Sequence, residues 1–205
     1  MPVFFICFIV FIIWFRVKMK RSNSSVSEEN EAFWEREKQA NFARTRDIST
    51  LDYLTVTDTQ LPFSASDASQ DEREADLEQQ VRETSQRKML NLSAYSNTDL
   101  KEQYGIANLE ELSNCDQNFL LFIRALANWG AYLYEKEDLS RSRQIMEYSR
   151  SIGSDISSVY TTLGNIYARE GDMAKVDELI DEVEQSDFSL KNTIIKQLKL
   201  CKLEY

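Results

Sequence analysis

Histidine is absent from the 205-residue chain, which also contains only five glycines, two prolines and three cysteines. Without imidazole, most protein metal sites and the His-based catalytic triads are excluded. The cysteines Cys7, Cys115 and Cys201 lie too far apart in the sequence to form the closely spaced pairs of a zinc site or a disulfide framework. No glycine-rich phosphate loop and no activated nucleophile pattern is present. We therefore predict that the protein is not an enzyme and holds no cofactor and no metal.

Positive charge is concentrated at the start of the chain. The whole chain has 24 Lys and Arg against 34 Asp and Glu, a net charge of −10. Four of the cations are Arg16, Lys18, Lys20 and Arg21, so the rest of the chain carries 20 cations against 34 acids, a net of −14. Binding the phosphates of nucleic acid requires a basic surface. The acidic body therefore disfavours nucleic acid as a partner.

The first fifteen residues carry no charge and are rich in Phe and Ile. An uncharged run followed at once by cations is typical of a membrane-spanning helix with a stop-transfer flank. We predict a single transmembrane anchor at residues 1–19; because a span usually needs about 17 to 25 residues, it must include Val17 and Met19. A cleaved signal peptide stays open as an alternative, although its cations would precede the apolar run. Cations are retained on the cytoplasmic side, so the C-terminal domain is predicted to be cytoplasmic.

Residues 20–95 have the composition of a juxtamembrane stalk, partly helical and partly flexible. Ser22 to Ser27 is a polar spacer, and residues 28–44 and 70–92 are predicted helices with few apolar positions. Between these helices, an apolar stretch that ends at Leu61-Pro62-Phe63 is predicted to be extended, because proline forces the residue before it out of the helical region. We expect this stretch to dock on the C-terminal body as an extended arm.

The remaining residues, 96–205, are predicted to form an all-helical domain. The strongest amphipathic helix has apolar residues at offsets of 3, 4, 7, 10 and 14 from Phe119, which fit a 3.6-residue period. Leu139, Ile145, Met146 and Ile152 mark the helix that returns, and Gly153 is placed to end it. A shift of 34 residues brings similar residues together: Leu126 on Tyr160, Trp129 on Leu163, Gly130 on Gly164, Leu133 on Tyr167 and Asp138 on Asp172.

This repeated pattern resembles the tetratricopeptide repeat (TPR) family, whose consensus has the form W-x2-L-G-x2-Y. The second unit carries it as Tyr160-x2-Leu163-Gly164-x2-Tyr167, and the resemblance covers about residues 117–205 in two degenerate units. It implies an all-α fold of stacked helical hairpins, closed by a capping helix that begins near Lys191. A plain bundle of helical hairpins stays open as the alternative.

The resemblance also implies a peptide-binding groove along the first helix of each unit. Its residues would be Arg124, Asn128, Tyr134, Thr161, Asn165, Arg169, Asn192, Lys196 and Lys199. Cationic and amide side chains bind the carboxylates and backbone amides of peptides, so the implied partner is a protein or peptide with an acidic or C-terminal segment. The carboxylate clamp of some family members is not reproduced, because Ala127 and Ala131 occupy its positions in the first unit. A solvated polar face is the alternative interpretation.

Together these features predict a membrane-anchored protein–protein interaction module, a TPR-like adaptor or scaffold that recruits a cytoplasmic protein or peptide. The open alternative is a permanent structural or assembly subunit of a membrane protein complex. The two differ in their free state: the body of an adaptor is expected to be a stable monomer, whereas that of a subunit is expected to self-associate.

Overall fold

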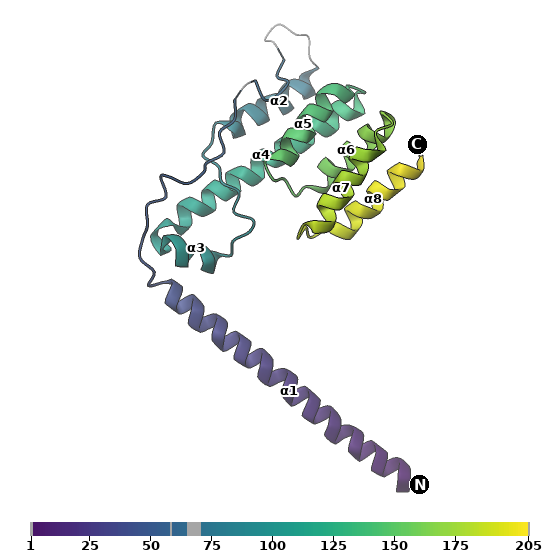
Figure 1. The fold of residues 1–205 in the computed structure, drawn as a ribbon. Coiled ribbons are helices and arrows are strands. Elements are labelled where there is room, and N and C mark those ends of the chain that lie inside the picture. The colour runs from purple at the N-terminus through teal and green to yellow at the C-terminus, as the bar shows by residue number, and fades with distance from the viewer. Residues whose placement is uncertain (1, 58, 65–70, 205) are drawn as a thin grey trace. The chain divides into compact units, whose positions relative to one another are not determined.

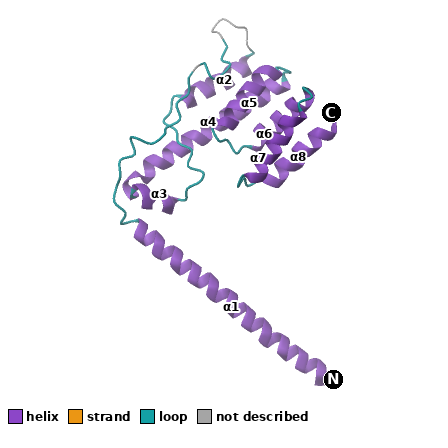
Figure 2. Cartoon of the chain, viewed as in Figure 1, coloured by secondary structure: helices purple, strands orange, loops and turns teal. Residues whose placement is uncertain are grey.

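The computed structural model describes residues 2–57, 59–64 and 71–204, and every regular element in these ranges is a helix (Figures 1 and 2). This composition agrees with the predicted helical class. A short 3₁₀ turn, Ile106–Asn108, lies between α3 and α4. The α-helices, in chain order, are α1 (Pro2–Ala40), α2 (Glu72–Ser85), α3 (Asn97–Tyr104), α4 (Leu109–Glu135), α5 (Leu139–Ser151), α6 (Ser157–Arg169), α7 (Met173–Gln185) and α8 (Lys191–Glu204).

The predicted transmembrane anchor at residues 1–19 is wrong. Among the described residues, no helix combines the length and the apolar character needed to cross a membrane. The uncharged run has fifteen residues before Arg16, fewer than the roughly 17 that a spanning helix needs. The predicted single-pass membrane localisation is wrong for the same reason, and the cytoplasmic orientation derived from it loses its basis. The predicted spacer at 22–27 also differs, because these residues continue α1.

The chain divides into two compact units, and each unit is assembled from two separate stretches of sequence. The first unit consists of residues 1–51 and 94–112, and the second consists of residues 52–93 and 113–205. This division differs from the predicted boundaries at 19 and 95. The difference is clearest in the predicted stalk, where Val81 and Met89 are fully buried in the second unit.

Ion pairs join the last turns of α1 to α3 within the first unit. The Arg36 guanidinium lies 2.6 Å from carboxylate oxygens of both Asp99 and Glu102. Glu37 accepts a hydrogen bond of 2.7 Å from the Thr98 hydroxyl and pairs with Lys101. These bonds, first the one from Lys101, lower the pKa of the Glu37 carboxyl.

The segment after α1 is held against the end of α3 through its backbone. Arg46 N–H donates to the Tyr104 carbonyl over 3.1 Å, and the Asn108 amide donates to the Arg46 carbonyl over 2.7 Å. Gly105, at a φ of 85°, permits this approach, because a Cβ at its position would lie 2.7 Å from Thr45 Cα.

The second unit contains two apolar clusters. In Figure 1 its helical hairpins, α4 with α5 and α6 with α7, follow one another and α8 lies beyond them; α5 contacts α6, and α8 contacts both α6 and α7. The first cluster lies among α2, α4, α5 and the extended segment before α2, and includes Leu61, Val81, Met89, Phe122, Leu126, Trp129 and Ile145. The second lies among α6, α7 and α8, and includes Tyr160, Leu163, Tyr167, Leu179, Val183, Ile194 and Leu198.

The turns of the two hairpins share one geometry at the 34-residue spacing. Asp138 caps α5 and Asp172 caps α7, each through its side chain, and the backbone N–H of each donates over 2.9 Å to a carbonyl five residues earlier. The residue before each cap has a positive φ, 61° at Glu137 and 77° at Gly171. The internal repeat in the sequence therefore corresponds to a repeated turn, while membership of the TPR family stays a prediction.

The two glycines of the repeated pattern have different neighbours. A Cβ on Gly130 would lie 2.8 Å from Met146 Cε in α5, the second helix of its own hairpin. A Cβ on Gly164 would lie 2.4 Å from Leu198 Cδ2, which belongs to α8. Gly130 therefore contacts its own hairpin, whereas Gly164 contacts α8, the element that follows its hairpin.

Candidate functional site

The nine predicted groove residues all lie in the second unit, three each on α4, α6 and α8. None of them is fully buried. On α4 they are Arg124, Asn128 and Tyr134; on α6 they are Thr161, Asn165 and Arg169; on α8 they are Asn192, Lys196 and Lys199. The structure therefore leaves all nine side chains at least partly accessible, which a binding surface requires.

Several of these side chains are already engaged within the chain. Arg169 donates to Glu137 over 2.8 Å, and its guanidinium carbon lies 5.1 Å from the centre of the Tyr134 ring. The Asn165 side-chain oxygen lies 2.8 Å from the thiol of Cys201 on α8. These contacts tie the α4, α6 and α8 parts of the predicted groove together, but they also occupy polar groups that a ligand would use.

Part of the predicted groove lines a cavity on α8. The cavity has a volume of about 410 Å³ and is lined by Asn192, Thr193, Lys196, Gln197 and Leu200. Two of these residues, Asn192 and Lys196, belong to the predicted groove. The other three lining residues were not predicted, because the family pattern does not place their positions in the groove. They are Thr193, Gln197 and Leu200.

Charge is divided between the last two helices. α7 carries five acidic residues and one lysine, whereas α8 carries four lysines and one glutamate. Three of the α8 lysines contact α7 or the segment that joins it to α8: Lys191 donates to the Ser186 carbonyl over 3.0 Å, Lys199 lies 3.8 Å from Glu184, and Lys202 lies 2.6 Å from Asp177. Within the described part of the chain, Lys196 has no such partner, and it is the lysine that lines the cavity.

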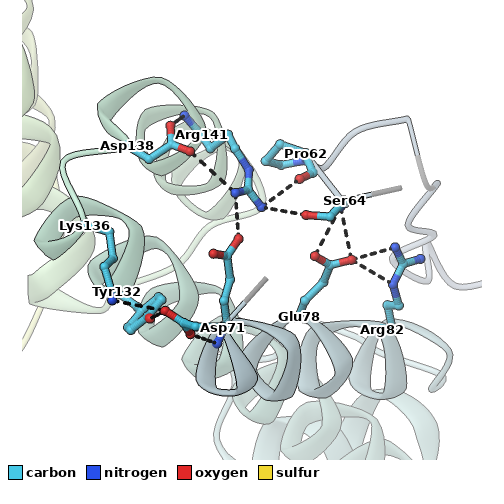
Figure 3. Close-up of polar contacts among 10 residues, drawn as sticks. Pro62, Ser64, Asp71, Glu78, Arg82, Tyr132, Lys136, Asp138 and Arg141 are labelled. Carbon is cyan, nitrogen blue, oxygen red and sulfur yellow. Dashed lines mark hydrogen bonds and ion pairs between the residues drawn. The ribbon is translucent and has the colours of Figure 1, made fainter. Parts of the chain in front are cut away.

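A second cavity, of about 810 Å³, lies between α2 and α4. It is lined by Asp71, Glu72, Arg73, Asp76, Tyr132, Glu135 and Lys136. Figure 3 shows Asp71 at the start of α2 beside Tyr132 and Lys136; the Tyr132 hydroxyl donates to Asp71, and Lys136 Nζ lies 3.1 Å from the same carboxylate. The hydrogen bond from Tyr132 is the main reason that the pKa of Asp71 falls to about 2. Lys136 therefore pairs with Asp71, while the lining as a whole keeps four carboxylates against two cations.

Sequence reasoning did not find this second cavity because it depends on a distant pairing. Asp71 and Tyr132 are 61 residues apart, and in the sequence Asp71 is only one of several acids at a helix start. Among the described residues, no group of three or more Cys, Asp or Glu side chains is arranged to hold a metal ion.

Comparison with known proteins gives no family for this chain. No family model, no curated protein and no solved structure matches it.

Proposed function

We propose that the chain is a protein-interaction module that binds an acidic or C-terminal peptide segment at the α8 cavity. The observation that carries this proposal is Lys196, an exposed cation that lines a cavity and has no partner among the described residues. The proposal keeps the interaction role predicted from the sequence and does not involve a membrane.

The residues around Lys196 have the chemistry that a carboxylate ligand requires. The ammonium group supplies charge, and the amides of Asn192 and Gln197 supply further hydrogen-bond donors. Leu200, 46% exposed, provides an apolar contact for a neighbouring side chain of the ligand. A peptide carboxylate beside a hydrophobic residue matches this arrangement.

The remaining groove residues support a longer contact. Arg124 and Asn128 on α4 are exposed, and their side chains make no hydrogen bond or ion pair with the described residues. In TPR-like proteins the corresponding face binds extended peptides, and the resemblance extends that expectation to this chain. The body as a whole is acidic, so an acidic peptide would be attracted to α8 locally and repelled elsewhere, which favours a short segment over a large acidic surface.

The test measures binding of a labelled peptide to the full chain by fluorescence anisotropy. The probe is a decapeptide of alternating Glu and Leu with a free carboxyl terminus, and the control peptide has Gln in place of Glu and a terminal amide. We expect Lys196→Gln to weaken binding of the acidic probe about tenfold, because a charge-assisted hydrogen bond contributes about 1.5–3 kcal/mol. Binding should also weaken as salt concentration rises.

The matched control variant is Arg87→Gln, which removes one exposed charge beyond the end of α2. It should leave the affinity unchanged. Equal affinities of the acidic and the control peptide, or equal losses in the Lys196 and Arg87 variants, would contradict the proposal.

A second candidate function, a permanent subunit of a protein complex, is favoured by apolar side chains exposed near the C-terminus. Leu190 is 55% exposed and Leu203 is 82% exposed. Such residues are covered in an obligate complex. Light scattering on the purified chain separates the two functions: an interaction module remains monomeric, whereas a subunit without its partner self-associates.

A further inference from the structure

Two helices cover one side of α8. It packs against α6 and α7, and in Figure 1 it is the last helix of this row. The buried residues of α8 follow one another at intervals of 4 and 3 positions, so they lie on one side of the helix: Ile194, Leu198 and Cys201. The core of the second unit therefore uses this side of α8.

Four exposed residues form a second stripe along α8. They follow one another at intervals of 3, 4 and 3 positions: Thr193, Lys196, Leu200 and Leu203. These are the intervals of the a and d positions of a heptad, through which two helices pair along a seam. We call these four residues the α8 seam. From the rise of an α-helix, the seam is about 15 Å long.

The seam has a hollow and exposed apolar side chains. Thr193, Lys196 and Leu200 line the cavity of about 410 Å³, and every residue that lines this cavity belongs to α8. Leu200 is 46% exposed, and Leu203, outside the cavity, is 82% exposed. A hollow between the side-chain rows of one helix is filled by the side chains of a second helix that packs on it. The seam therefore has the shape and the apolar content of a helix–helix contact.

Charge selects the helix that can pair with the seam. Residues 192–203 include three lysines and no acid. Lys196 belongs to the seam, and Lys199, whose side chain is 61% exposed, is next to Leu200 in the sequence. A second copy of α8 would bring lysines close to lysines, which is unfavourable. An acidic helix is attracted by the same lysines.

α7 is an acidic helix of this kind, and it packs on the other side of α8. Its apolar residues have the same intervals of 3, 4 and 3 positions: Met173, Val176, Ile180 and Val183. Lys199 Nζ lies 3.8 Å from Glu184, and Lys202 Nζ lies 2.6 Å from Asp177. Lysines of α8 thus pair with acids of an amphipathic helix within this chain, which supports the same pairing at the seam.

We propose that the α8 seam binds an acidic amphipathic helix of another protein. The partner helix places apolar side chains at heptad spacing on Leu200 and Leu203, and its acids lie beside Lys196 and Lys199. Binding of an amphipathic helix on an apolar groove is a general mode of peptide recognition. This inference rests on the proposed function, because it names the conformation and the chemistry of the segment that the α8 cavity takes.

The experiment measures fluorescence anisotropy of labelled peptides with the full chain. The probe is the 13-residue sequence of α7, MAKVDELIDEVEQ, with blocked ends. One control peptide, MAKVNQLINQVQQ, replaces every acid by its amide. The other, MAKVDELPDEVEQ, keeps the charge but cannot form a continuous helix, because proline breaks the helix interior. We expect the probe to bind at least tenfold more tightly than either control.

Two variants locate the bound helix. Leu203→Ser removes an apolar side chain of the seam that lies outside the cavity, and Lys196→Gln removes the seam's charge. Each should weaken binding of the probe about tenfold and leave the helical circular dichroism of the chain unchanged, because both side chains are exposed. Phe42→Ser is the matched control and should leave binding unchanged, because Phe42 is 83% exposed but belongs to the first unit.

The outcomes separate this inference from the proposed function. Equal binding of the probe and the proline peptide, or no binding of either, would overturn the helical inference. The proposed function would still stand if the decapeptide of Glu and Leu bound in a manner that depends on Lys196, and it would be overturned as well if that peptide did not bind. Equal affinities of the Leu203 and Phe42 variants would also overturn the inference. So would a concentration-dependent dimer that Leu203→Ser abolishes, because the seam would then be covered by a second copy.

Discussion

Gly164 and Leu198 lie so close together that a methyl group at residue 164 should destabilise the second unit. An ideal Cβ on Gly164 lies 2.4 Å from Leu198 Cδ2, and the Leu198 side chain is fully buried. Forcing an extra methyl group into a packed interface costs about 1–3 kcal/mol. Replacing a glycine inside a helix with alanine returns about 1 kcal/mol of helix propensity. We therefore expect Gly164→Ala to lower the free energy of unfolding by about 1 kcal/mol.

A double-mutant cycle isolates this contact. Leu198→Ala alone should cost about 2–5 kcal/mol, because it opens a cavity in the α6–α7–α8 cluster. In that background the added methyl group at residue 164 meets open space, so Gly164→Ala should become neutral or stabilising. The two substitutions are thus expected to be non-additive by about 1–2 kcal/mol.

Urea unfolding of the full chain, followed by circular dichroism, measures the four free energies of the cycle. Gly130→Ala with Leu198→Ala is the matched control, because Gly130 faces Met146 instead of Leu198 and should give an additive cycle. If the Gly164–Leu198 cycle is additive within about 0.5 kcal/mol, α6 and α8 do not meet at this point and the reasoning is refuted.

Three further substitutions test single contacts of the second unit. Ser142→Ala should lower the free energy of unfolding by about 1 kcal/mol in urea titrations, because the buried Ser142 hydroxyl donates to the Gly130 carbonyl over 2.7 Å. The carboxylate of Asp71 has a pKa of about 2 in the folded chain against an ordinary 3.8, so the stability it contributes is present above pH 3.8 and is lost as the pH falls towards 2. The melting temperature of the Asp71→Asn variant should accordingly depend less on pH between 4 and 2 than that of the wild type. Identical dependences on pH would show that the hydrogen bond from Tyr132 does not lower the pKa of Asp71 in the folded chain. Arg169→Glu should change the free energy of unfolding by less than about 1 kcal/mol, because the ion pair of Arg169 is partly exposed. The same substitution should weaken binding of the acidic probe peptide. Unchanged binding would show that the α6 residues of the predicted groove do not contact the peptide.

Local features of this chain are determined by its sequence. Asp138 and Asp172 are predicted by the 34-residue shift to be equivalent, and both cap the second helix of a hairpin. Gly105 ends α3 at a positive φ, a conformation that favours glycine. Helix caps and amphipathic periods depend on residues within a few positions of one another, so they are visible in the sequence.

Only the tertiary structure decided which distant segments meet. Arg141 and Pro62 are 79 residues apart, and no periodic pattern links them. The predicted helix at 70–92 ends at Ser85, because the residues beyond it are held elsewhere: the backbone N–H of Leu90 donates to the Cys115 carbonyl over 3.3 Å. The neighbour of Gly164 was likewise settled by packing against α8 and not by the repeat pattern. Such contacts depend on burial of apolar area shared between remote segments, which is a property of the folded chain as a whole.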